Sequence, residues 1–416
     1  MDERRFARRR ATLRLWSEQL TSRRQRCENR AEWDRYRSVR RTFDAGNIAR
    51  HIRETPASYR RQQGSIERSS MYDTIVTPAE IVVVGAGMVA HRFVESLLSR
   101  AQTPLHVTVI GDEGRRPYDR IGLPRIASGG AAEDLELDRS VFEDFRVRFL
   151  DDDRALRIDR AARTVMTRSR VVVPYDTLVL ATGSYTPIFA VEGADLPGCF
   201  SDRTIDDVEA LAQFAAGRRR SLGRRLRAAV VGRGSHGAEL AAALHDIDVV
   251  STLVEHSESR ISHLVPEESG AVGAVRFDDG ETEAVDLVVL SVHPRPRDEL
   301  ARNANLQVAE RGGVVIDDRC TTSDPHILAI GEVARFDGRC VPRVAPGYAM
   351  AEVAASRILG GDAVFLGFDQ PFSGSRTPGH DDPTAGEEST AVIVIGELAE
   401  SGMLRLASSR IAKGVG

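Results

Sequence analysis

The chain has 416 residues, of which 42% are hydrophobic and 28% charged, and its formal net charge is −4. This length is enough for two or three domains, and no apolar run approaches the ~18 residues of a membrane span. The start of the chain lacks the charged and apolar regions of a signal peptide. Four cysteines stand far apart, so we predict no redox disulfide and no zinc or clustered iron–sulfur site, and we expect a cytoplasmic protein. These cysteines are Cys27, Cys199, Cys320 and Cys340.

Residues 1–70 differ in composition from the rest of the chain. They contain 19 arginines and nine acidic residues, whereas residues 71–416 contain 38 basic and 52 acidic residues. Such a segment suits an arm that binds nucleic acid or an anionic surface. It also suits a disordered tail, or an extension upstream of a natural start at Met71. We favour the second interpretation, and so we do not expect a nucleic-acid partner.

Residues 81–95, IVVVGAGMVAHRFVE, predict a strand, a glycine turn and a helix in immediate succession. Four β-branched residues at its start are typical of a buried parallel strand. In the G-x-G-x-x-A pattern, Gly85 permits the tight turn, Gly87 lets backbone approach a pyrophosphate, and Ala90 keeps helix and strand close. The free N–H groups and the dipole of the helix N-terminus then face the phosphates. Taken alone, the pattern also fits a plain glycine turn of any α/β protein.

The next elements place polar residues at the carboxyl end of the same predicted sheet. Residues 106–110 predict the second strand, and Glu113 follows it as the acidic residue expected to hold an adenosine ribose hydroxyl, with Asp112 as the neighbouring candidate. The loop that follows ends at Arg120 and lies where doubly wound folds bind ligands. Further on, strands are predicted for residues 146–150, 162–167 and 170–174, all three antiparallel, and for 175–180, which is parallel and runs into Ala181, Thr182 and Gly183.

A second complete glycine motif, G-x-G-x-x-G, follows the strand predicted for residues 227–231. Its glycines are Gly232, Gly234 and Gly237, and a helix is predicted for residues 238–244. The second strand of this unit, residues 249–254, ends at Glu255, which is expected to accept a hydrogen bond from a ribose 2′-OH. No arginine follows immediately to pair with a 2′-phosphate, so NADH is favoured over NADPH.

The rest of the chain contains weaker signals. Strands are predicted for residues 276–280, 284–292, 313–316, 327–330 and 391–395, a helix for 348–359, and a loop for 370–390. Gly331 and Glu332 follow the strand that ends at Ile330. Only 20 residues separate Glu255 from the strand at Arg276. These residues would have to contain both a crossover of about a dozen residues and a further parallel strand. We therefore expect a second dinucleotide unit with a shortened or missing crossover helix and strand.

Two dinucleotide motifs with A-T-G between them and G-E after them form a constellation. The chain resembles the two-dinucleotide-fold flavoprotein reductases of the pyridine nucleotide-disulfide oxidoreductase superfamily. Within it, the match is to the FAD/NADH portion of assimilatory NADH-dependent nitrite reductase large subunits, with rubredoxin and ferredoxin reductases next. The runs that carry the resemblance include VVVGAGMVAHRFVESLL, YDTLVLATGSYTP, VVGRGSHGAELAAAL and RGGVVIDDRCTTSDPHILAIGEVA, and together they cover residues 79 to about 360.

The resemblance implies a role for each matching residue. The FAD contacts would be Gly85, Gly87, Ala90, Glu113, Arg120, Ala181, Thr182, Gly183, Gly331 and Glu332. The NADH contacts would be Gly232, Gly234, Gly237 and Glu255. The ferredoxin-reductase branch has a lysine–glutamate pair near the flavin, and counting along the motifs puts Arg125 and Glu239 at those positions. We hypothesise that they meet as a catalytic charge pair; the alternative is that Arg125 is a solvated loop residue.

The predicted fold is α/β, with two doubly wound Rossmann-like domains, the NAD domain inserted in the FAD domain. The boundaries are 1–70 (arginine-rich extension), 71–205 and 311–360 (FAD domain), 206–310 (shortened NADH domain) and 361–416 (remnant of an interface domain). The expected function is an NADH-dependent FAD oxidoreductase without iron–sulfur or siroheme modules, which passes electrons to an unidentified acceptor such as a small redox protein. The alternative is a catalytically weakened flavin-binding protein, a sensor or gene remnant. Val292 and His293 depart from the family pattern, and a homodimer is left open.

Overall fold

The computed structural model describes residues 77–187, 191–232, 235–254, 261–291, 294–369 and 394–395. The chain divides into two units, Met1–Ile75 and Val76–Gly416. The predicted extension 1–70, Gly234, Glu255 and the Val292-His293 pair lie outside the described residues. None of the helices in the described ranges has the length and apolar character needed to cross a membrane.

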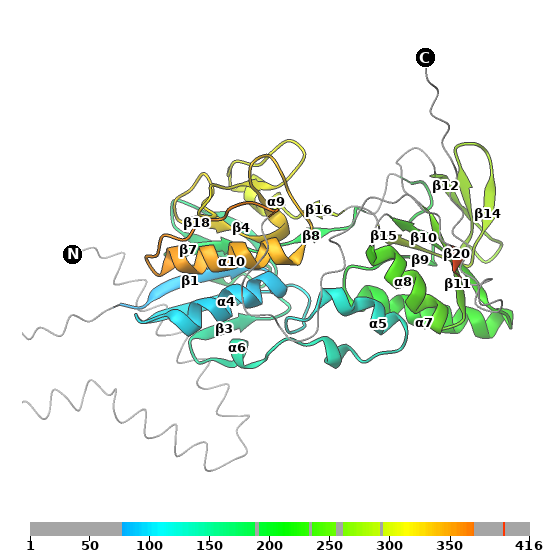
Figure 1. The fold of residues 1–416 in the computed structure, drawn as a ribbon, viewed down its shortest axis with the longest axis horizontal. Coiled ribbons are helices and arrows are strands. Elements are labelled where there is room, and N and C mark those ends of the chain that lie inside the picture. The colour runs from blue at the N-terminus through cyan, green and yellow to red at the C-terminus, as the bar shows by residue number, and fades with distance from the viewer. Residues whose placement is uncertain are drawn as a thin grey trace, which may run out of the picture. The chain divides into compact units, whose positions relative to one another are not determined.

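The second unit has two halves in space. The half that contains the start of the described chain, called the first half below, is built on a five-stranded parallel sheet (Figure 1). Its strands, in spatial order, are β18 (Ile327–Ala329), β7 (Thr177–Leu180), β1 (Ala79–Val84), β2 (Leu105–Ile110) and β3 (Val147–Leu150). Residues 81–84 of β1 are buried because the sheet is covered on both faces, which explains the unbroken β-branched run. Helix α4 (Met88–Arg100) crosses from β1 to β2, and α10 (Val344–Ile358) packs against α4. The predicted strand–turn–helix is therefore present.

A small antiparallel sheet is attached to this half. It consists of β4 (Ala155–Asp159), β5 (Thr164–Thr167) and β6 (Val172–Pro174). One prediction here was wrong, and one strand was not predicted. The strand predicted for residues 146–150 is β3, which pairs parallel with β2, and β4 was not predicted. The reason is that β3 is a half-buried edge strand and β4 carries two consecutive exposed residues, so neither shows the buried run typical of a parallel strand or a clean alternation.

The second half is built on another, largely parallel sheet. Its strands, in spatial order, are β20 (Val394–Ile395), β11 (Val249–Val254), β10 (Leu226–Gly232), β15 (Leu287–Ser291) and β9 (Cys199–Ser201), with only β20 antiparallel. Helices α7 (Ile205–Leu222) and α8 (Ser235–Asp246) pack on this half, and separate hydrophobic clusters occupy the two faces of the sheet. Both predicted dinucleotide folds are therefore observed.

The second half lacks a standard crossover after β11. Only six residues separate Val254 from the next strand, β12 (Ile261–Pro266), which pairs antiparallel with β13 (Val272–Phe277), and β13 pairs with β14 (Thr282–Ala284). Six residues are too few for a helical crossover to another parallel strand, which takes a dozen or more. The predicted shortening is confirmed, whereas strand β12 itself was not predicted.

Several short elements join the two halves. Strands β8 (Ser184–Tyr185) and β16 (Arg295–Pro296) pair across them, and α5 (Leu123–Ala127) packs against α7 and α8. The chain passes from the first half to the second before the predicted boundary at residue 206, because β9 already belongs to the second sheet. The remaining elements are η2 (Arg120–Gly122), η3 (Ala132–Leu135), α6 (Ser140–Glu143), α9 (Glu299–Asn303), β17 (Val314–Val315), η4 (Gly331–Val333) and β19 (Ala334–Arg335).

Candidate functional site

The turn after β1 can be built only with glycine at its first position. Gly85 has φ +111°, and a Cβ on it would lie 2.1 Å from the carbonyl oxygen of Ala181, the residue after β7. Gly87, in contrast, faces open space: the nearest heavy atom to a Cβ built there is Arg120 Nε, at 3.9 Å. Gly87 is also the N-cap of α4, and it supplies no side-chain cap. The turn thus leaves the N–H groups of α4 available to an anion.

Three polar side chains form a cluster beside this turn. The Tyr118 hydroxyl donates to Glu113 Oε2 (2.7 Å), and Arg120 Nη1 donates to the Tyr118 oxygen (2.9 Å). Arg120 Nη2 is also paired with Glu113 Oε1. Burial raises the pKa of Tyr118, so the hydroxyl stays protonated at neutral pH. Each Glu113 oxygen keeps a second lone pair, so the carboxylate can still accept from a ribose hydroxyl.

The A-T-G loop and the G-E segment approach the same turn. The Thr182 hydroxyl donates to the Arg297 carbonyl (2.7 Å), and the Arg297 N–H donates to the Gly183 carbonyl (2.9 Å). Gly331 has φ +75°, and a Cβ there would lie 3.3 Å from Val89 of α4. The predicted FAD residues of three distant segments are therefore brought together at the carboxyl end of the first sheet.

Glu332 lies in a second polar cluster. Its Oε2 accepts from Arg203 Nη2 (3.0 Å) and from the Ser184 hydroxyl, which itself accepts from Arg203 Nη2 (2.7 Å). Arg203 directly follows the Asp202 that ends the β9 segment, and its carbonyl accepts from Arg120 Nη1 (2.6 Å). Arg203 thus connects both polar clusters, although it was not singled out in the sequence.

The available groups fit FAD. A glycine turn with space at Gly87 and an uncapped helix N-terminus suit the pyrophosphate. Arg120 lies beside it as a cation, and Glu113 follows the second strand, as a ribose ligand should.

The second glycine turn repeats the construction of the first. A Cβ on Gly232 would lie 2.2 Å from the carbonyl oxygen of Ser291, the last residue of the neighbouring strand β15. Gly237 lies in α8, where a Cβ would be 3.4 Å from Leu253 of β11. In both halves the first residue of the motif must be glycine, because a carbonyl group at the end of the neighbouring strand leaves no room for a Cβ. Gly234 and Glu255, the other predicted NADH ligands, fall outside the described residues.

The predicted Arg125–Glu239 pair is not formed. Helix α5 packs against α8, but the Arg125 guanidinium turns back toward Gly122 and Asp119, with Nη2 3.9 Å from Asp119 Oδ2. Arg125 has 61% of its side chain exposed and Glu239 is exposed. Both lie in the described part of the chain, and no ion pair within 4 Å joins them there. Water can solvate each charge, so nothing drives the pair together.

A buried ion pair at the second glycine turn was also missed. Asp202 has 2% of its side chain exposed, and its Oδ2 lies 3.1 Å from Nε2 of His236, the second residue of α8. The nearby Asp202 carboxylate raises the pKa of His236 above its ordinary value. A histidine inside a glycine motif and an aspartate directly after a parallel strand were the signals available in the sequence.

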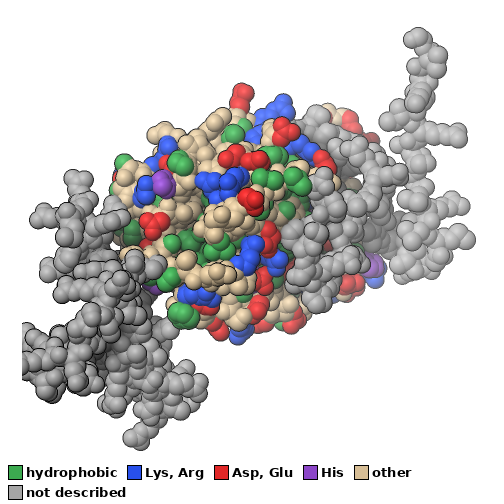
Figure 2. Space-filling model, turned by 60° about the vertical axis from the view of Figure 1, so that its left-hand side comes forward, with side chains coloured by type: hydrophobic (Ala, Val, Ile, Leu, Met, Phe, Trp, Pro, Cys, Tyr) green, Lys and Arg blue, Asp and Glu red, His purple; other side chains and the backbone are tan. Residues whose placement is uncertain are grey.

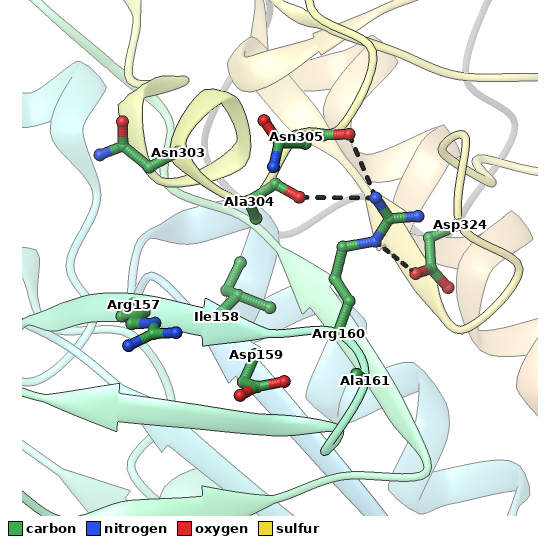
Figure 3. Close-up of a pocket in the computed structure, with 9 residues that line it drawn as sticks. All are labelled: Arg157, Ile158, Asp159, Arg160, Ala161, Asn303, Ala304, Asn305 and Asp324. Carbon is green, nitrogen blue, oxygen red and sulfur yellow. Dashed lines mark hydrogen bonds and ion pairs between the residues drawn. The ribbon is translucent and has the colours of Figure 1, made fainter.

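An open hollow of about 500 Å³ lies elsewhere on the first half (Figure 3). Arg160 crosses one side of it, donating to Asp324 Oδ2 (2.7 Å) and to the Asn305 carbonyl (3.1 Å). Asp324 precedes β18, so the hollow lies at the amino end of the parallel sheet. Ligands of doubly wound sheets bind at the carboxyl end, and the glycine turns are there.

Comparison with known proteins agrees with this geometry. The family model for pyridine nucleotide-disulphide oxidoreductases matches residues 79–272 and 258–356. The NADH nitrite reductase large subunit of Escherichia coli (strain K12) is 37% identical over an alignment of 325 residues, and the match covers 71% of this chain and 38% of that protein. The chain thus spans well under half the length of that relative.

Solved structures show the same fold. The ferredoxin reductase of the CYP199A2 system from Rhodopseudomonas palustris superposes with a TM-score of 0.62 at 28% identity, over 71% of this chain and 78% of that one. The putidaredoxin reductase of a covalent putidaredoxin complex, at 23% identity, gives a TM-score of 0.61 over 68% of this chain and 76% of that one. The chain therefore belongs to the pyridine nucleotide-disulphide oxidoreductase family, whose members bind FAD and NAD(H).

Proposed function

We propose that this chain oxidises NADH and passes the electrons through bound FAD to a separate acceptor. The observation that carries the proposal is the duplicated turn: Gly85 and Gly232 each sit under the terminal carbonyl of a neighbouring parallel strand. Two such turns in one unit suit one dinucleotide each. When bound, FAD supplies the hydride-accepting chemistry that no side chain offers.

The residues of the chain supply binding and orientation. The N-terminus of α4 and Arg120 would hold the FAD pyrophosphate, and Glu113 the ribose. Ordering of the flavin side falls to the A-T-G loop, which Arg297 fixes through the Thr182 hydroxyl and the Gly183 carbonyl. Because Arg297 follows β16 and Gly183 precedes β8, this contact also holds the segment returning from the NADH half. Such positioning is the protein's main contribution to hydride transfer.

The experiment is an absorbance titration of the purified full-length protein. A flavin spectrum is expected, and anaerobic NADH is expected to bleach it. Gly232→Ala introduces a Cβ against the Ser291 carbonyl, so this variant is expected to keep its FAD and to lose bleaching at the same NADH concentration. Gly217→Ala, in α7 with no atom within 4 Å of its Cβ, is the control and should bleach as the wild type does. A protein without flavin, or equal bleaching of Gly232→Ala, contradicts the proposal.

A second candidate function is supported by the six residues between β11 and β12. Because the NADH half lacks its usual crossover, the chain is also suited to be a flavin-binding protein with weakened turnover, such as a sensor. The same titration separates the two: the second candidate retains the flavin spectrum and does not bleach at any NADH concentration.

We also propose that the acceptor is a small redox protein and that the chain acts in the cytoplasm. Support for the acceptor comes from the relatives, which include a ferredoxin–NAD(+) reductase component of Paraburkholderia xenovorans at 27% identity. Support for the compartment comes from Cys199, Cys320 and Cys340, which are free thiols. A homodimer remains open, to be tested by sedimentation of the holoprotein.

A further inference from the structure

The Asp202–His236 pair joins two elements that meet at the second glycine turn. Asp202 follows β9, at the carboxyl end of the second sheet, and His236 lies in the first turn of α8 directly after the glycine motif. The aspartate has 2% of its side chain exposed, whereas His236 has 37% exposed. The carboxylate is thus buried behind the imidazole, and the imidazole reaches the surface beside the predicted pyrophosphate position.

A buried carboxylate needs a positive partner. Arg203, the next residue along the chain, is directed away to Ser184 and Glu332. Among the described residues, the Nε2 of His236 is the cationic group within 4 Å of Asp202. A cation at a helix N-terminus is normally disfavoured by the helix dipole. The buried aspartate offsets this cost, so the protonated ring is the form that this arrangement stabilises.

We infer that the Asp202–His236 pair is a proton-dependent positioning device for NAD(H) at the second glycine turn. This inference rests on the proposed function. With the ring protonated, the pair is neutral and the N-terminus of α8 can receive the pyrophosphate. Loss of the proton leaves one buried, uncompensated negative charge next to the anionic ligand, and nucleotide binding weakens.

Other charged side chains surround His236. Glu239 lies one turn further along α8, Arg203 follows Asp202, and both act on the ring. Of the elements packed against α8, α5 carries Arg125 and β10 carries Arg227, whereas β11 and β20 carry no titratable side chain. Glutamate and arginine keep their charge between pH 6 and pH 9. The imidazole is therefore the group whose change of charge governs nucleotide affinity there.

The test is calorimetric titration of NAD+ into the full-length, FAD-loaded protein at several pH values from 6 to 9. The oxidised nucleotide binds without turnover. Wild-type affinity is expected to fall about tenfold across this range, which corresponds to a ring pKa raised by about one unit on binding. Asp202→Asn removes the buried charge and lowers the pKa of the His236 ring, so the fall in its affinity should move to lower pH, and its affinity at pH 9 should exceed that of the wild type.

His236→Gln leaves the carboxylate without its partner and should bind weakly at every pH. His245→Gln, at the other end of α8, is the matched control and should follow the wild-type profile. Flavin absorbance and the thermal midpoint check that each variant is folded, and if His236→Gln does not fold, the different pH profiles of the wild type and Asp202→Asn decide the question. An independent readout is the NMR titration of the His236 ring, whose pKa Asp202→Asn should lower.

Two outcomes contradict the inference in different ways. Wild-type protein that binds NAD+ equally at all pH values, or an Asp202→Asn variant that keeps the wild-type slope, contradicts the inference and leaves the proposed function intact. Wild-type protein that holds FAD but binds no NAD+ at any pH contradicts the proposed function and the inference with it.

Discussion

Asp286, just before β15, forms a buried clamp at the amino end of an interior strand of the second sheet. Its two oxygens accept from Arg224 Nη1 and Nη2 at 2.8 and 2.7 Å, and Oδ2 also accepts from the Arg227 N–H at 2.7 Å. Burial works to raise the pKa of Asp286, but the hydrogen bonds from Arg224 and from the Arg227 backbone outweigh it and lower the pKa below the ordinary value. The folded state therefore prefers the ionised carboxylate.

Asp286→Asn is expected to lower the free energy of unfolding by about 2 kcal/mol at pH 7, because bonds to a charged acceptor are lost. A lowered pKa gives stability that is present above the unfolded value and disappears as pH falls through the folded one. The difference between wild type and variant should accordingly shrink below about pH 4. The urea midpoint measures both effects.

Asp248→Asn is the matched control for this prediction. Asp248 pairs with Arg219, but 52% of its side chain is exposed, and asparagine tolerates its left-handed backbone (φ 62°). The midpoint should therefore change little, since exposed pairs contribute at most about 1 kcal/mol. A loss as large as that of Asp286→Asn would show that burial of the clamp is unimportant.

Sequence reasoning identified residues whose role depends on backbone conformation, and it missed residues whose role depends on a side-chain partner. Gly85 and Gly232 were identified because a turn under a strand end requires glycine. Arg203 and Asp202 were missed because their partners, Glu332 and His236, lie more than 30 residues away in the chain. The expected Arg125–Glu239 contact failed for the same reason, since motif spacing does not determine where a long exposed side chain points.

The connection after β11 leads to a prediction about the nucleotide half. With six residues in place of a crossover helix and strand, the half has less structure to bind the adenosine end. We expect tight FAD binding, weak NADH binding and slow flavin reduction. A stopped-flow titration measures this, and half-saturation well above micromolar NADH is the expected result. Fast bleaching that saturates at micromolar NADH would show that the short connection is tolerated without loss.

Strand patterns explain which elements the sequence could predict. Strand β11 has the predicted bounds, Val249–Val254, because it is a run of β-branched and apolar residues. Strand β12 was missed because its burial is irregular and its pairing with β13 contains two register shifts. An antiparallel strand of that kind is specified by its neighbour more than by its own residues. Its six residues lie between Glu255 and Arg276, in the segment for which the sequence predicted no helix or strand.

The division at Ile75 and Val76 supports a prediction about the intact protein. Residues 1–70 carry 19 arginines and precede Met71, close to the division. Deletion of these 70 residues is expected to leave the ratio of FAD to protein unchanged, because the FAD residues all lie in Val76–Gly416. The ratio is measured from flavin and protein absorbance. A truncated protein that is insoluble or free of flavin would contradict the prediction.

Charge is distributed in a mixed pattern over the described surface. Figure 2 shows arginine and acidic side chains interspersed on one face. Exposed or half-exposed pairs include Arg92–Glu352, Arg115–Asp206 and Arg168–Asp152. Mixed charge of this kind favours solubility over binding to a polyanion.

The ion pairs of the described part are formed by arginine or histidine with a carboxylate, and the chain of 416 residues has a single lysine, Lys413. A guanidinium does not react with the acylating reagents that modify lysine. Amine-directed dyes and cross-linkers therefore react with Lys413 and with the α-amino group of the chain, and they leave the clusters at Arg120 and Arg203 unmodified. The chain thus has a natural labelling site for single-molecule work on a flavin-binding fold, and this site does not have to be engineered.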